Sequence, residues 1–119
     1  FLAFAAISGF LSVALGAFGA HALKATLPPN LLATFHTGVD YQMAHTLAVF
    51  AVALAAKEVP RSLKISGLAF AVGILIFSGS LYLLVFTQQT WLGAITPIGG
   101  VCFLVGWLSL IFFAFRKDI

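Results

Sequence analysis

The stretch FHTGVDYQMAHTL at residues 35–47 gathers side chains that can carry a proton or bind a metal. His36 and Asp40 are four residues apart, as are Tyr41 and His45, so each pair would share one face of a helix. Histidine and carboxylate groups serve as proton carriers and as metal ligands. The stretch is therefore a candidate for a catalytic or metal site, for a proton or cation pathway, or for a structural cluster of hydrogen bonds.

The composition of the chain limits the class of protein that carries this stretch. The chain has 119 residues, of which 62% are hydrophobic and 8% charged, and its mean hydropathy is +1.15. So few polar residues do not cover the surface of a soluble globule. The sequence predicts an integral membrane protein with a single transmembrane domain over residues 1–119. The net charge of +3 is explained by basic residues at membrane flanks, so we expect no nucleic-acid partner.

Apolar segments long enough to cross a bilayer follow one another along the chain. A hydrocarbon core of about 30 Å needs about 20 helical residues. The predicted spans are 1–23, 31–56, 65–86 and 91–115. Asn30 follows two prolines and is the expected N-cap of the second helix. The fold class is therefore all-α, a polytopic four-helix bundle in the membrane.

Basic residues predict the orientation of these spans. Lys and Arg concentrate in the middle connection and at the C-terminus, namely Lys57, Arg61, Lys64, Arg116 and Lys117. The first connection has only Lys24, and the third has none. The positive-inside rule then places both termini and the middle connection in the cytoplasm.

The beginning of the chain carries two expectations of its own. The chain starts at Phe1 rather than at methionine, so we expect the native start to lie upstream. Ala20-His21-Ala22 resembles a signal-peptidase site, but the apolar run before it is longer than a signal peptide needs. We therefore expect a retained first span.

Small residues indicate where the helices pack, because close approach must replace the hydrophobic effect in lipid. In the first span they are Ser8, Ser12, Gly16, Gly19 and Ala20. In the fourth span they are Gly99, Cys102, Gly106 and Ser109. Because Cys102 is the only cysteine, it forms no disulfide within one copy. Pro97 is expected to kink the fourth span, because a proline inside a helix removes a backbone hydrogen bond.

Depth along each span places most polar side chains in the outer half of the membrane. The predicted cluster consists of His21, Asp40, Tyr41, Gln42, His45, Ser78, Ser80, Tyr82 and Thr96. Together they predict a polar cup that is open to the outside above an apolar base. The cluster either binds a ligand or joins the helices. Thr34, Thr37, Tyr41 and His45 form one helical stripe, and His36 with Asp40 lies on a different face.

For the ionisable residues several roles stay open. His36 with Asp40 fits a structural pair, a proton or cation site, or metal ligation, and His45 fits a hydrogen bond to a serine or tyrosine of the next helix or a ligand role. A metal would take His21, His36 and Asp40, but the chain has no HExxH or CxxC spacing. We predict no metal, no cofactor and no catalytic residue.

Several motifs run in the same order as in a known family. They are LGAFGAHALK (15–24), TGVDYQMAHTLAV (37–49), FSGSLYLL (77–84), TPIGG (96–100) and GW (106–107). The chain resembles the small membrane family of bacterial YgdD proteins and eukaryotic transmembrane protein 256, over nearly its whole length. The resemblance implies four spans, a bacterial inner membrane and no established activity. The family's motif residues correspond to Gly16, Gly19, His21, Tyr41, Gln42, His45, Ser78, Gly79, Ser80, Tyr82, Thr96, Pro97, Gly99 and Gly100.

The sequence favours a non-enzymatic protein that binds a small ligand, a lipid headgroup or a protein through the cup. The first alternative is an accessory subunit of a larger membrane complex, in which the cup residues mainly join helices. A small transporter or proton pathway and a metal-dependent membrane enzyme are the further alternatives. Expected partners are the lipid bilayer and either another membrane protein or further copies of this chain.

Overall fold

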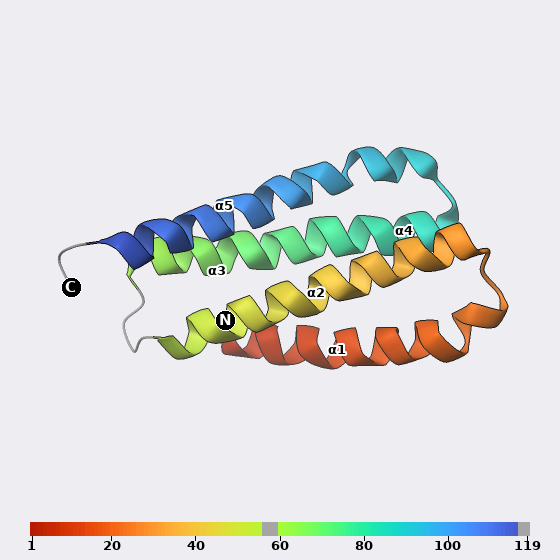
Figure 1. The fold of residues 1–119 in the computed structure, drawn as a ribbon, viewed down its shortest axis with the longest axis horizontal. Coiled ribbons are helices and arrows are strands. Elements are labelled where there is room, and N and C mark those ends of the chain that lie inside the picture. Colours follow the sequence, from red (N-terminus) through yellow and green to blue (C-terminus); the bar gives the residue numbers. More distant parts are fainter. Residues whose placement is uncertain (56–59, 117–119) are drawn as a thin grey trace.

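The computed structural model describes residues 1–55 and 60–116, and these residues form four long helical rods that lie side by side (Figure 1). The elements are α1 (Leu2–His21), η1 (Leu23–Ala25), α2 (Pro29–Ala55), α3 (Arg61–Gly73), η2 (Ile74–Ser78), α4 (Gly79–Thr87), η3 (Thr90–Ala94) and α5 (Thr96–Phe115). No strand occurs among the described residues. The prediction of an all-helical chain is thus confirmed.

Three of the rods are long and apolar enough to cross a membrane by themselves. They are the first rod (Leu2–Ala25), the third rod (Arg61–Thr87) and the fourth rod (Thr90–Phe115). The remaining rod, α2, has 27 residues and so measures about 40 Å, but it carries the polar stretch described above. Its length is therefore sufficient, while its hydropathy is lowered by polar residues, of which Gln42, His45 and Thr46 are buried against neighbouring helices.

The rods form a flattened bundle of 54 × 26 × 17 Å (Figure 1). α2 and α3 are the inner pair, α1 packs mainly against α2, and α5 packs mainly against α3. Two apolar clusters fill the interior. One, at the end where α2 and α5 finish, contains Ala5, Val49, Phe70, Ile74 and Phe103. The other, at the opposite end, contains Leu23, Phe35, Val39 and Val85.

The helix ends differ from the predicted ones in instructive ways. α2 begins at Pro29, so Asn30 lies in its first turn and does not cap it. Proline is favoured at the first helical position because its missing N–H has no partner there in any case. The predicted end of the second span at Ala56, together with Lys57 and Lys117, falls outside the described residues.

The prediction that Pro97 kinks the fourth span is wrong. It lies in the first turn of α5, and the preceding turn is the 3₁₀ segment η3. The proline therefore marks the start of an α-helix, where the loss of one backbone donor is harmless.

The third rod contains a feature that the sequence did not reveal, a π-helical turn at η2. Its N–H groups reach one residue further back than in an α-helix, and the N–H of Gly79 donates to the carbonyl of Ile74. The rod nevertheless continues through α4 and ends at Gln88, which adopts a left-handed conformation with φ of 57°. α3 and α4 thus form one continuous rod with one extra residue in its middle.

Candidate functional site

Polar side chains gather in the middle part of the bundle, between and alongside the two apolar clusters. We call this group the polar belt; its members are Ser8, Gln42, His45, Thr46, Ser78, Ser80, Tyr82, Thr96 and Trp107. Along α2, the belt residues 42–46 follow Val39 of one cluster and precede Val49 of the other. The belt joins all four rods.

Gln42 is the centre of the belt. Its side chain is only 5% exposed. Its amide Nε2 donates to the backbone carbonyl of Ser8 at 3.1 Å and to the Ser8 hydroxyl at 3.2 Å. Its Oε1 accepts the hydroxyl proton of Tyr82 at 2.6 Å. One side chain of α2 therefore joins α1 to α4, and Ser8 makes a further hydrogen bond to Thr46 at 2.7 Å.

A second hydrogen bond joins α2 to the third rod, from a residue one turn before Tyr82 to a residue one turn before Gln42. The hydroxyl of Ser78 donates to the backbone carbonyl of Gly38 at 2.6 Å. Gly38 also leaves room for the ring of Tyr82, because a Cβ at this position would lie 2.8 Å from a ring carbon. The absence of a side chain at Gly38 is thus what lets Tyr82 reach Gln42.

His45 is a fully bonded, neutral histidine. Its Nδ1 lies 2.8 Å from the carbonyl of Tyr41, which can only accept, so Nδ1 carries the proton. Its Nε2 accepts from the indole N–H of Trp107 at 3.1 Å. The ring stacks on Phe103 with centroids 3.6 Å apart and planes 9° apart. No ring nitrogen is left to bind a metal or to take up a proton without breaking a bond.

The partner of His45 differs from the expected one. The sequence suggested a serine or tyrosine of the next helix, whereas the donor is Trp107 of α5. The signal was present in the chain, because His45 lies ten residues before the end of α2 and Trp107 eight residues before the end of α5. Both ends lie at the same side of the bundle (Figure 1), so the two side chains lie at similar depths.

The other predicted cluster residues fall into two groups. Ser80 and Thr96 share a hydrogen bond of 2.5 Å that joins α4 to α5. His21 and Asp40 are exposed, and Tyr41 is 45% exposed although its ring packs on Phe77 with centroids 4.6 Å apart. The structure therefore brings most of the hydroxyl and amide residues together and leaves His21 and Asp40 at the surface.

The predicted stripe on α2 is only partly directed inward. Thr37 and Tyr41 are exposed, and His45 lies at the edge of the buried face. That face is centred on Gln42 and includes Phe35, Gly38, Val39, Thr46, Val49 and Val52. It reflects the close contact of α2 with α1 and α3, which the spacing of polar residues on one helix does not show.

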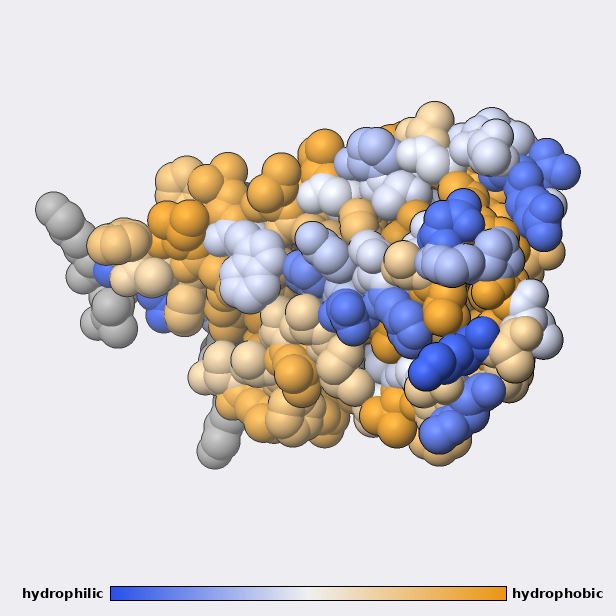
Figure 2. Space-filling view, turned by 45° about the vertical axis from the view of Figure 1, so that its right-hand side comes forward, coloured by the Kyte–Doolittle hydropathy of each residue, from blue (hydrophilic) through white to orange (hydrophobic). Residues whose placement is uncertain are grey.

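The structure also differs from the predicted open cup. The apolar cluster of Leu23, Phe35, Val39 and Val85 occupies the interior between the belt and the end of the bundle that was expected to be open. Polar residues do gather at the surface of this end (Figure 2). Towards this end of the bundle, the belt is covered by the apolar packing of the cluster.

A metal site has no support from the arrangement. Among the described residues, which include all three histidines, Asp40 and Cys102, no group of three or more His, Cys, Asp or Glu side chains could hold a metal ion. His36 is half-buried and lies near Gly19, whereas His21 is exposed. The three candidate ligands His21, His36 and Asp40 thus do not form one site.

The predicted packing residues of α1 take different positions. Ser8, Ser12 and Gly19 are buried, and Gly16 faces Val39. Ala20 is exposed and does not take part in the packing of α1. The reason is geometric: each step of four residues turns a helix by about 40° beyond a full circle, so three such steps from Ser8 move Ala20 by about 120°.

The packing residues of α5 make very close contacts with the third rod. At Gly99, a Cβ would lie 2.4 Å from the backbone nitrogen of Phe77 in the π turn. At Gly106, a Cβ would lie 2.5 Å from the ring of Phe70. Cys102 is half-buried and lines a groove between α3 and α5. Ser109 donates to the backbone carbonyl of Ser62 at 2.6 Å.

Nearly all buried polar atoms are thus bonded inside the protein. In the part of the chain that the structure describes, only Nε of Arg116 is a buried side-chain nitrogen or oxygen without a hydrogen-bond partner. Helices of this length and hydropathy, joined at mid-depth by such a belt, define a polytopic helical membrane protein.

Comparison with known proteins identifies the family. The chain belongs to the family described as "Protein of unknown function (DUF423)", which matches residues 15–100. It is 47% identical to a UPF0382 membrane protein of Haemophilus influenzae, over 98% of this chain and 94% of that protein. It is 45% identical to the UPF0382 membrane protein YwdK of Bacillus subtilis, over 93% and 92% respectively.

The UPF0382 inner membrane protein YgdD of Escherichia coli is 44% identical, over 97% of this chain and 88% of that protein. No solved structure matches the chain. The chain is accordingly a multi-pass inner-membrane protein, and the resemblance to the YgdD family is confirmed.

Proposed function

We propose that this protein acts without chemistry of its own, by binding other constituents of the inner membrane at grooves on its surface. The observation that carries the proposal is the bonding of the polar belt. His45 and Gln42 have their donors engaged inside the bundle, so neither offers a free group for acid–base catalysis or a proton pathway. The belt then serves to hold four helices together in lipid.

We also propose that all four rods cross the membrane, with both termini in the cytoplasm. α2 lies between α1 and α3, so it must cross wherever they do (Figure 1). Its polar residues would be tolerated at depth because Gln42, His45 and Thr46 are bonded to neighbouring helices. The basic residues Arg61, Lys64 and Arg116 at one end support the orientation.

Cysteine labelling tests this topology. In a Cys102→Ser background, Thr26→Cys and Gln89→Cys should react with a membrane-impermeant maleimide in intact cells. Lys64→Cys should react only after permeabilisation. The reverse pattern would invert the orientation, and labelling of Thr26 and Gln89 from opposite sides would exclude four spans.

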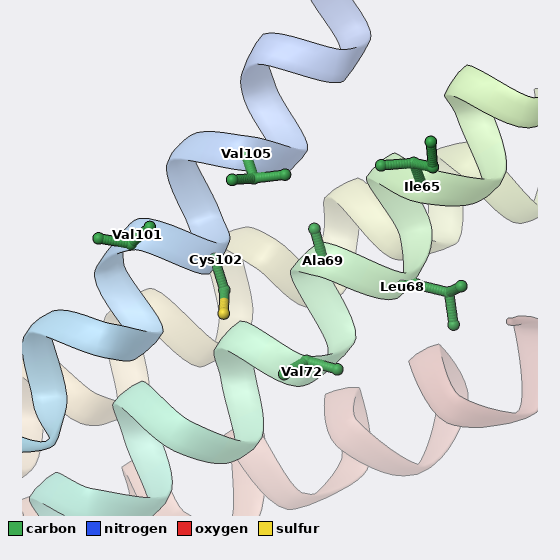
Figure 3. Close-up of a pocket in the computed structure, with 7 residues that line it drawn as sticks. All are labelled: Ile65, Leu68, Ala69, Val72, Val101, Cys102 and Val105. Carbon is green, nitrogen blue, oxygen red and sulfur yellow. The ribbon is translucent and has the colours of Figure 1, made fainter.

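A groove between α3 and α5 is one surface where such binding could occur (Figure 3). It has a volume of about 350 Å³, and its lining is aliphatic apart from the thiol of Cys102. In Figure 3 the side chains of Ala69 and Cys102 lie between the two helices and form the floor of the groove. The groove is therefore shallow and open to lipid. An apolar side chain or acyl chain fits this lining, and the same groove supports the accessory-subunit alternative.

Native mass spectrometry of the protein taken from membranes in lipid nanodiscs tests the binding role. We expect a constituent retained at fixed stoichiometry and enriched over the bulk membrane. Ala69→Phe should reduce retention if this groove holds the constituent, whereas Ala17→Phe on exposed α1 surface should not. Retention that only mirrors bulk lipid composition in all variants would contradict the proposed function.

A further inference from the structure

A second groove, between α1 and the third rod, has a polar floor. It consists of two adjoining hollows of about 170 and 230 Å³, which share Leu11, Gln42, Ile74 and Leu75. Their combined size is in the range of sites that hold small organic molecules. Apolar side chains form the walls, and the floor is formed where Tyr82 bonds to Gln42.

Gly79 widens this groove. It lines the hollow next to Tyr82, and a Cβ at this position would meet no atom within 4 Å. The wall of the groove is therefore bare backbone at one point, unlike Gly99 or Gly106, where a partner fills the space. The space at Gly79 is not used by packing within the chain.

The hydrogen-bonding state of the floor is determined by its contacts. The hydroxyl proton of Tyr82 is donated to Gln42 Oε1, and the amide nitrogen of Gln42 donates to the carbonyl and the hydroxyl of Ser8. The hydroxyl proton of Ser78 is donated to Gly38. The Tyr82–Gln42 pair keeps acceptor capacity in the lone pairs of the Tyr82 oxygen and the second lone pair of Gln42 Oε1. A ligand that brings a hydroxyl donor can therefore bond to this pair.

We propose that this groove binds a membrane-soluble alcohol, whose hydroxyl donates to the Tyr82–Gln42 pair while its hydrocarbon chain lies between α1 and the third rod. Inside a bilayer an unpaired hydroxyl is costly, so an acceptor at mid-depth attracts a donor that lacks water. Towards the N-terminal end of α1, the groove continues along Ile7 and Phe4. From Leu11 to Phe4 the helix rises about 10 Å, which accommodates roughly eight methylene groups.

This inference rests on the proposed binding function and names its ligand class. The probe is a long-chain primary alcohol that carries a photoactivatable diazirine in its chain, and the matched probe is its methyl ether, which has no donor. Both are added to the purified full chain in nanodiscs, and labelled peptides are identified by mass spectrometry. We expect saturable labelling of α1 and the third rod by the alcohol, at least tenfold above the ether.

Filling the groove provides the decisive variant. Gly79→Leu should reduce alcohol labelling at least tenfold, because the new side chain occupies the hollow. Gly100→Leu is the matched control, since its Cβ also meets nothing within 4 Å but lies on α5. Both variants are checked for unchanged helical circular dichroism and melting temperature. Tyr82→Phe should reduce the preference for the alcohol over the ether. Labelling that depends only on the hydrocarbon part of the probes should remain.

The possible results separate the two proposals. Equal labelling by alcohol and ether, or full labelling of Gly79→Leu, would overturn the alcohol site and leave the wider binding role standing. If Gly79→Leu does not fold, competition of unlabelled alcohol against the probe in the unmodified chain decides the same question, since an absence of competition overturns the site. The wider binding role is tested separately by native mass spectrometry. It fails if retention only mirrors the bulk lipid composition in all variants.

Discussion

The contact of α1 with α2 and the contact of α5 with α3 are held together in different ways. α1 is joined to α2 through hydrogen bonds of Ser8 with Gln42 and Thr46. α5 is pressed against the third rod at Gly99 and Gly106, where backbone and aromatic rings leave no room for a Cβ. Both ways replace the hydrophobic effect, which does not favour one helix surface over lipid. Each contact also uses the other means, since Gly19 of α1 lies against Phe35 and Ser80 bonds to Thr96 of α5. The comparison teaches that one small bundle can centre one contact on a buried amide and the other on the approach of backbone to backbone.

The largest effect is expected where α5 approaches the π turn. Gly99→Ala would place a methyl group 2.4 Å from a backbone nitrogen, which cannot move aside as a side chain can. We expect the free energy of unfolding to fall by about 3 kcal/mol. Reversible unfolding in mixed micelles of increasing dodecyl sulfate content measures it.

The neighbouring glycine is the control for this substitution. At Gly100 a Cβ meets nothing within 4 Å, and alanine is a better helix former than glycine. Gly100→Ala should leave the free energy of unfolding unchanged or raise it by up to about 1 kcal/mol. Equal losses at the two positions would show that close approach at Gly99 does not hold α5.

On the α1 side, Gln42→Leu should have a smaller effect. It removes the bonds to Ser8 and Tyr82, and hydrogen bonds between membrane helices contribute about 0.6 kcal/mol each on average. We expect a loss of about 1–2 kcal/mol in the same unfolding measurement. The additional change Tyr82→Phe should cost less in the Gln42→Leu protein than in the original chain. Strictly additive losses would contradict a direct bond between the two side chains.

Trp107→Phe tests the bond that links α2 to α5. It leaves Nε2 of His45 without a donor while keeping an aromatic ring at the position. We expect the free energy of unfolding to fall by about 0.5–1 kcal/mol. Trp91→Phe is the control, because Trp91 is exposed at the start of the last rod. If Trp91→Phe lowered the free energy of unfolding more than Trp107→Phe, the hydrogen bond from Trp107 to His45 would not be what stabilises the contact of α2 with α5.

The smallest effect is expected at Asp40. This carboxylate is exposed on α2 and is not one of the hydrogen-bonded residues that define the polar belt. Asp40→Asn should change the free energy of unfolding by less than about 0.5 kcal/mol. A loss comparable to that of Gln42→Leu would mean that the ionisable residues on α2 hold the bundle together as the belt does.

The sequence predicted the helices well because hydropathy depends on local composition. Its predicted cluster contained two pairs that the structure shows bonded, Gln42 with Tyr82 and Ser80 with Thr96, because depth along a span follows from counting residues. It misjudged Ala20 and Tyr41, since the direction of a side chain around a helix depends on which neighbours the helix has. It missed the π turn because η2 contains only ordinary apolar residues and one serine.

The closed cup is the most informative of these differences. Depth placed the polar residues correctly relative to the helix ends, but it carried no information about what covers them. Phe35 and Val85 are almost completely buried, and they close the interior above Gln42. Apolar residues in an apolar chain give no signal that separates those facing lipid from those facing the interior.

The π turn has a consequence for how the length of this protein can vary. Removing one residue from α3 would turn every later side chain by about 100°, and Tyr82 would no longer face Gln42. Removing one residue from Ile74–Ser78 would instead close the wide turn into an ordinary α-helical one. Within the third rod, this segment is where a chain of this fold can gain or lose a residue while α4 keeps its contacts with α2.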